Sequence, residues 1–209
     1  GAGAHGWVSG AVKARAATSY NRDRGPVVYE PQSLEAPKGF PADDRGNILG
    51  PPDGRIASAN HIGQNGQPNF SALDEQYADR WYHWPIQQGS LTLDWTFTAP
   101  HSTTKWEYFM TKQGWNPDAP LARSEFEKIA EIGSRNGTAH ADENPSHTIN
   151  IPPDRRGYHV ILAVWTVADT ANAFYNVIDV HVEDPGVTTT TAVPGGPTTT
   201  PTTHVHVTS

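Results

Sequence analysis

The chain contains no cysteine among its 209 residues. This absence excludes disulfide bonds, thiolate metal sites and cysteine nucleophiles. No run of about eighteen apolar residues is present either, so no segment could cross a membrane as a helix. Basic residues are also few, because 15 Lys and Arg stand against 22 Asp and Glu and leave a net charge of −7. This surplus of negative charge argues against nucleic acid or an anionic membrane as a partner.

Aromatic and turn-forming residues are plentiful. Seven Trp, seven Tyr and six Phe allow one sizeable core, and 19 Gly with 18 Pro favour short strands and many turns over long helices. Five segments alternate β-branched or aromatic residues with polar ones and are predicted to be strands. They span residues 91–99, 105–111, 147–151, 158–167 and 174–183. The pattern predicts an all-β fold, an antiparallel β-sandwich of the immunoglobulin or fibronectin-III type.

The segment from Pro31 to Trp84 has little periodicity and is rich in Pro, Gly, Asp and Asn. It is too long for an ordinary connection, so we expect a functional insertion of long loops and short helices between early strands.

Both ends of the chain differ in composition from the middle. Residues 1–4 are small and fit either a signal-peptidase site or an expression remnant, and the first alternative makes His5 the mature N-terminus. Residues 185–209 are rich in Thr and Pro, which predicts a linker or tail and a further C-terminal module. We therefore expect one domain over residues 5–184.

Motifs of several common enzyme classes are missing. The sequence has no GxSxG nucleophile elbow, no phosphate-binding glycine motif and no HExxH. Acidic pairs such as Asp43 with Asp44 are common on solvated surfaces and indicate no glycosidase by themselves.

An N-terminal histidine has unusual chemistry. If His5 has a free amine, that amine and its own ring nitrogen Nδ1 can chelate one metal ion, since an α-amine loses its proton far more readily than lysine. A second imidazole completes a three-nitrogen set suited to copper. His101 is the best candidate, because it lies in a turn between two strongly predicted strands. The other histidines of the predicted domain are expected to be ordinary surface or capped residues: His61, His83, His140, His147, His159 and His181.

Four segments together resemble one enzyme family. They are HGWV (5–8), VYEPQSLEAPKGF (28–40), TAPHSTTKWEYFMTK (98–112) and HVILAVWTVADTANAFYNVIDV (159–180). In order and spacing they are similar to the bacterial lytic polysaccharide monooxygenases of auxiliary activity family 10, and the resemblance covers nearly all of residues 5–182.

The resemblance implies a copper site. His5 and His101 match the family's copper-binding histidine pair, and Phe174 matches the aromatic residue on the axial side of the metal. Ala99 matches the small residue at the other axial approach. An apolar axial face leaves a position open for the oxygen co-substrate.

The resemblance also assigns neighbouring positions. Glu35 matches an acid beside the copper that positions the co-substrate, and Trp165 matches a tryptophan packed behind the site. A flat polysaccharide-binding face is implied for Tyr29, Glu30, Asp169 and Asn172.

The implied reaction is oxidative cleavage of a crystalline polysaccharide by a secreted, monomeric enzyme. It needs one copper ion, an external electron donor, and O2 or H2O2 as co-substrate. Chitin attacked at C1, with aldonic-acid ends as products, is expected in preference to cellulose. Two further alternatives are a non-catalytic chitin-binding protein and a copper carrier. The chain departs from the family in lacking disulfides, and if residues 1–4 stay attached, the His5 nitrogen is an amide that cannot bind copper.

Overall fold

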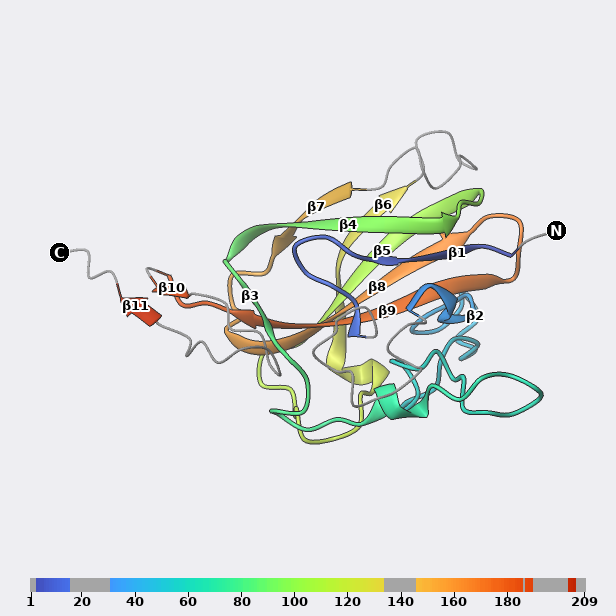
Figure 1. Ribbon diagram of the computed structural model, residues 1–209, viewed down its shortest axis with the longest axis horizontal. Helices are drawn as coiled ribbons and strands as arrows, with labels where there is room; N and C mark the ends of the chain where they lie inside the picture. The colour runs from blue at the N-terminus through green and yellow to red at the C-terminus, as the bar shows by residue number, and fades with distance from the viewer. Residues whose placement is uncertain (1–2, 16–30, 134–145, 186, 190–202, 206–209) are drawn as a thin grey trace.

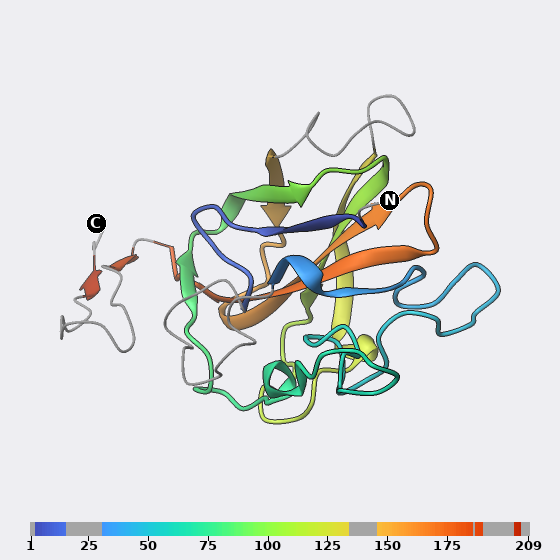
Figure 2. The same ribbon diagram turned by 45° about the vertical axis from the view of Figure 1, so that its right-hand side comes forward.

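Two β-sheets pack face to face, and a layer of loops covers the outer face of the larger sheet (Figures 1 and 2). The computed structural model describes residues 3–15, 31–133, 146–185, 187–189 and 203–205.

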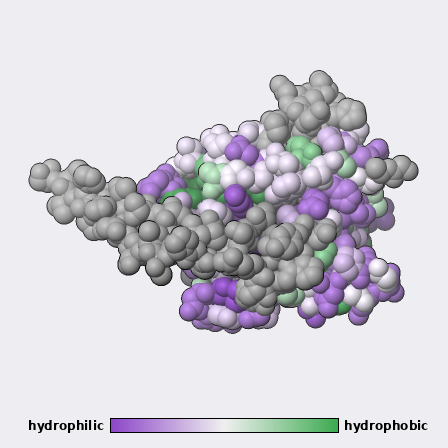
Figure 3. Space-filling model, viewed as in Figure 1, coloured by the Kyte–Doolittle hydropathy of each residue, from purple (hydrophilic) through white to green (hydrophobic). Residues whose placement is uncertain are grey.

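The smaller sheet contains β1 (His5–Val8), β4 (Gly89–Ala99) and β7 (Ser146–Ile151), in the order β1-β4-β7 with antiparallel pairing. Along β4, Leu91, Leu93 and Trp95 are buried and alternate with polar residues that face outward. On the face of the molecule viewed in Figure 3, apolar colouring is accordingly confined to small areas. Alternation of this kind is why the segment was recognisable as a half-buried strand.

The larger sheet has the order β2-β9-β8-β5-β6. Its central strands β8 (Gly157–Val167) and β9 (Asn172–Val182) are buried along nearly their whole length. Strands that are covered on both faces read as continuous apolar runs rather than as alternating patterns. The remaining members are β2 (Glu35–Pro37), β5 (Thr103–Thr111) and β6 (Phe126–Gly133), with β3 (Trp84–Ile86) paired to the end of β9.

Two apolar clusters follow from this arrangement. One lies between the two sheets and includes Trp95, Trp106 and Trp165. The other lies between the larger sheet and the loop layer, where Phe40 and Trp81 pack on outward-facing residues of β8 and β9. Three 3₁₀ helices stand among these loops or beside them: η3 (Pro31–Ser33), η4 (Ser71–Asp74) and η5 (Arg123–Glu125).

The fold confirms the predicted all-β sandwich and its long insertion. All five predicted strands are present, with ends displaced by no more than two residues, but β1, β2, β3 and β6 were not predicted. The pairs among the predicted strands are antiparallel, as expected, and β3, which was not predicted, pairs parallel to β9. Within the predicted linker, the structure describes only the short antiparallel pair β10 (Val187–Thr189) and β11 (Thr203–Val205). Among the described residues, no helix is long and apolar enough to span a membrane.

His147 and His159 correct the expectation of ordinary surface histidines, because both are buried. His159 lies in β8, where its Nδ1 is 2.8 Å from the Thr111 hydroxyl and its Nε2 is 2.9 Å from the Gln113 side-chain oxygen. Burial, reinforced by the nearby Arg155 cation, lowers the pKa of His159 from 6.5 to about 4. The ring therefore stays neutral in the folded chain well below neutral pH.

We predict that His159 makes the fold sensitive to acid. The unfolded chain takes up a proton near pH 6.5 and the folded chain only near pH 4, so stability is lost as the pH falls between these values. The loss is at most about 3.5 kcal/mol, since each unit of pKa corresponds to about 1.4 kcal/mol. Urea unfolding of the unchanged chain and of His159→Gln, at pH 7 and at pH 4.5, measures it. The unchanged chain should lose more stability than the variant, and equal losses in the two proteins would contradict the assignment.

Candidate metal centre

The candidate metal ligands lie at one end of the sandwich. β1 and β4 pair so that His5 stands opposite Ala99, and His101 follows two residues later in the turn to β5. The start of β1, the end of β4 and the turn between β8 and β9 meet at the right-hand end of the molecule (Figure 1). Pairing between strands far apart in sequence thus brings the two histidines to the same end of the sandwich.

A carboxylate lies beside the His101 ring. The ring's Nδ1 is 2.7 Å from Oδ1 of Asp169, which belongs to the turn between β8 and β9. Metal-bound histidines commonly have a carboxylate next to the ring nitrogen that does not bind the metal, and such a partner leaves the lone pair of Nε2 for the metal. Sequence reasoning placed Asp169 on the polysaccharide-binding face, and the structure adds this contact with His101.

Hydrogen bonds from the core between the sheets hold the turn that carries His101. The Trp165 indole N–H donates to the Thr103 hydroxyl at 2.8 Å, and that hydroxyl donates to the backbone carbonyl of His101 at 3.1 Å. Trp165 is fully buried and stacks on Phe174 with the ring centroids 5.0 Å apart. A continuous set of contacts therefore runs from the core between the sheets to the histidine turn.

The His5 ring contacts Phe174, which stacks on Trp165. Its ring lies edge-on to Phe174, with centroids 6.2 Å apart, and its Nδ1 faces the backbone carbonyl of Gln32 at 3.3 Å. Phe174 has no polar atom to offer, so the side that it covers provides no protein ligand.

Glu35 lies in β2, directly opposite Phe174 in the register with β9. Its backbone carbonyl accepts a hydrogen bond from Nε2 of His61 at 2.5 Å, a contact that sequence reasoning missed. Glu35 also lines a hollow of about 150 Å³, together with the exposed Leu49. The acid is thus placed at the same end of the sandwich as both histidines.

The predicted polysaccharide-binding residues are only partly described. Asp169 is exposed, and Asn172 is half-buried where β9 begins. Tyr29 and Glu30 lie outside the described residues.

The chain matches, over residues 3–180, the family described as "Lytic polysaccharide mono-oxygenase, cellulose-degrading". It belongs to the lytic polysaccharide monooxygenase family. Among solved structures, it is similar to a Bacillus amyloliquefaciens CBM33 protein in complex with Cu(I), at 46% identity and a TM-score of 0.75, covering 85% of this chain and 99% of that one. A Streptomyces lividans AA10 lytic polysaccharide monooxygenase is similar at 38% identity and a TM-score of 0.71, covering 85% and 99% of the two chains.

The chain is also similar in sequence to curated proteins that are named for sugar binding. "GlcNAc-binding protein A" of Vibrio vulnificus is 49% identical over 166 residues, which cover 79% of this chain and 32% of the relative. The protein of the same name from Vibrio cholerae is 46% identical over the same coverage. The chain thus spans about a third of the length of these relatives.

The imidazole rings of His5 and His101 are ligands of a kind that copper binds. Within the described part of the chain, no group of three or more His, Cys, Asp or Glu side chains is placed to hold a metal. Nitrogen-only sets favour copper among the divalent metals. A third nitrogen from the main chain would be the His5 amine, which in this chain is bound in a peptide to Ala4, a residue only 3% exposed.

We predict that Asp169→Asn weakens copper binding about tenfold, as the loss of an orienting partner commonly does. The carboxylate holds His101 Nδ1 at 2.7 Å, and a neutral amide orients the ring less strongly. Calorimetric titration with copper, on protein that begins at His5 and without any polysaccharide, measures the change.

Asp184→Asn is the matched control, because Asp184 follows the far end of β9 and lies 3.8 Å from Arg156. Its affinity for copper should equal that of the unchanged protein. Equal affinity in the Asp169 variant would show that the carboxylate does not orient the ligand.

Proposed function

We propose that this chain, when it begins at His5, oxidatively cleaves crystalline chitin with copper as its metal. The observation that supports it most is that strand pairing brings His5, His101 and Glu35 to the same end of the sandwich, where Phe174 lies opposite Glu35 and edge-on to His5. When bound, copper supplies the one-electron chemistry. An external donor provides electrons, and O2 or H2O2 is the oxidant that allows an unactivated C–H bond to be broken.

In this proposal, the residues of the chain bind the metal and orient the groups around it. His5 and His101 would hold the metal, and Asp169 would keep the His101 ring turned so that Nε2 faces it. The side chains of Phe174 and Ala99 offer no polar atom there, so a position would stay open for the co-substrate. Glu35 positions the co-substrate from the neighbouring strand.

The polysaccharide contacts surround the histidines. Asp169 and Asn172 present polar side chains at the end of the sandwich. The family resemblance assigns Tyr29 and Glu30, which lie outside the described residues, to the same polysaccharide-binding role. A flat array of this kind suits the planar surface of a crystalline polymer better than a deep cleft does, because many chains are contacted at once.

Chitin attacked at C1 is the preferred substrate, and the relatives named "GlcNAc-binding protein A" support it. The family description names cellulose degradation, which supports cellulose as the second candidate. We further propose a secreted, monomeric domain over residues 5–184, followed by a linker over residues 185–209 that leads to another module.

Reductant-dependent products on β-chitin test the proposed activity. Copper-loaded protein that begins at His5 is incubated with β-chitin or cellulose, with and without ascorbate, and the soluble products are measured by mass spectrometry. Chito-oligosaccharides with aldonic-acid ends, formed only with reductant, are expected. Oxidised products from cellulose alone would favour the second candidate, and the absence of oxidised products from both polymers would leave a binding or copper-carrying protein.

Retaining Ala4 should abolish high-affinity binding of Cu(I). The His5 nitrogen is then an amide, whose proton Cu(I), unlike Cu(II), does not displace near neutral pH, and one chelating donor is lost. Titrations with Cu(I) under reducing conditions, on two proteins that begin at Ala4 and at His5, check this, with an expected difference of at least about a hundredfold, or near 3 kcal/mol. Equal affinities would remove the N-terminal amine from the proposed site.

A further inference from the structure

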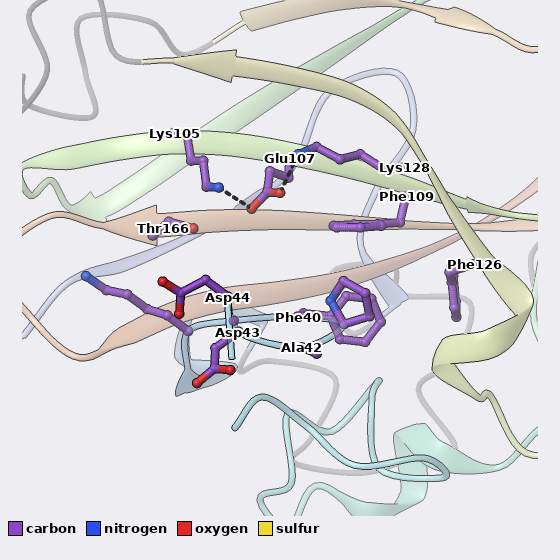
Figure 4. Close-up of a pocket in the computed structure, with 13 residues that line it drawn as sticks. Phe40, Ala42, Asp43, Asp44, Lys105, Glu107, Phe109, Phe126, Lys128 and Thr166 are labelled. Carbon is purple, nitrogen blue, oxygen red and sulfur yellow. Dashed lines mark ion pairs between the residues drawn. The ribbon is translucent and has the colours of Figure 1, made fainter. Parts of the chain in front are cut away.

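The loop layer leaves part of the larger sheet uncovered. Between the segment 38–44 and the strands β5, β6 and β8, a pocket of about 550 Å³ opens on the outer face of the sheet (Figure 4). This volume lies within the range of roughly 300 to 1,000 Å³ that is typical of small-molecule sites. Neither the copper ligands nor Glu35 line it.

The inner end of the pocket is apolar and well packed. Phe40, Phe109 and Phe126 line it, and each is less than a tenth exposed. Phe40 meets the other two rings edge-on, with centroids 5.1 Å and 6.2 Å apart. Rings that are fixed by one another offer a preformed apolar surface to a ligand.

A buried carboxylate lies next to this surface. Glu107 is 8% exposed, and its two oxygens are bound from opposite sides by Lys128 at 2.9 Å and Lys105 at 3.4 Å (Figure 4). Two ammonium groups neutralise the carboxylate electrostatically and still leave it lone pairs that can accept further hydrogen bonds.

The rim adds free polar groups. Lys38 and Asp44 line the pocket, and the side chain of neither has an ion-pair or hydrogen-bond partner among the described residues. Asp43 is already used, because its carboxylate accepts the backbone N–H groups of Arg45 and Asn47 at 2.9 and 2.7 Å. The Thr166 side chain also lines the pocket (Figure 4) and has no hydrogen-bond partner in the described part of the chain.

We propose that this pocket binds a soluble saccharide of one or two sugar rings. Its lining carries three ammonium groups and three carboxylates, so an ion of either sign would meet as many like charges as opposite ones. A neutral ligand rich in hydroxyl groups meets no such penalty. It donates to the carboxylates and accepts from the lysines, while the C–H faces of its rings pack on the phenylalanines.

A purely apolar ligand fits less well. It would cut off Lys38, Asp44 and Thr166 from water without replacing their hydrogen bonds, and each such loss costs free energy. A saccharide combines apolar faces with paired donors and acceptors, which is the combination that the lining presents.

The site is separate from the metal centre. Thr166 and Trp165 are neighbours in β8 and point to opposite faces of the sheet, since side chains alternate along a strand. Trp165 lies in the core between the sheets, beneath the histidine turn, and Thr166 faces the pocket. Saccharide binding here therefore requires no copper and does not rest on the proposed oxidative activity.

Chemical-shift mapping on the isotope-labelled chain tests the proposal. N,N′-diacetylchitobiose, cellobiose and, as an anionic aromatic comparison, benzoate are titrated in the presence of EDTA. Saturable shifts are expected with at least one disaccharide at amides of residues 38–44 and 105–109, and none with benzoate. Benzoate binding in place of the disaccharides, shifts confined to the surroundings of His5 and His101, or no saturable shift would each overturn it.

Two variants sharpen the result. Ala42→Trp places a large ring in the pocket from an exposed position on its wall, and it should raise the dissociation constant at least about tenfold. Ala11→Trp is the control, because Ala11 is equally exposed and does not line the pocket; its affinity should be unchanged. The double variant Lys38→Ala with Asp44→Ala removes only rim groups and should weaken binding about threefold or more. Unchanged affinity in both pocket variants would place the saccharide elsewhere.

Discussion

Burial of β8 and β9 on both faces is the constraint from which the rest of the structure follows. A pair of strands this apolar has to be covered twice: the smaller sheet covers one side, and the loops between β2 and β3 cover the other. The long insertion is therefore a structural layer as much as a functional loop. The same requirement positions the chemistry, because the turn between these two strands carries Asp169 to the place where β1 begins and β4 ends.

A chain without cysteine must join its layers by other means. Arg15, which follows β1 in the chain, pairs with Asp179 of β9 at 2.8 Å, and both side chains are almost fully buried. The same guanidinium donates to the backbone carbonyl of Leu73 and lies over the ring of Trp81 in the loop layer. One cation thus joins the segment after β1, the central sheet and the loops. Removing one partner of such a pair would leave the other charge buried without compensation.

Sequence reasoning succeeded where a signal was local. The long strands were predicted because alternation or an apolar run persists over many residues. His5 and His101 were selected because the first has special chemistry and the second lies in a clear turn, and their role as copper ligands stays a prediction. β1 and β2 are only four and three residues long, too short for a pattern to emerge. The contacts of Asp169 with His101 and of His61 with Glu35 join segments far apart in sequence, so only the folded chain shows them. The same holds for the charge balance around Glu107, which two separate strands and one loop create.

The burial of Ala4 bears on whether cleavage before His5 occurs before or after folding. A peptidase needs several residues on each side of its target bond to lie extended in its cleft, and a bond whose neighbours are packed against a core is withheld from it. Ala4 is 3% exposed, and His5 is already paired with β4. If the amine of His5 is to be freed, the cut has to come before β1 joins the sheet. Maturation then precedes folding, and a chain that folds uncut keeps its amine locked in the peptide bond.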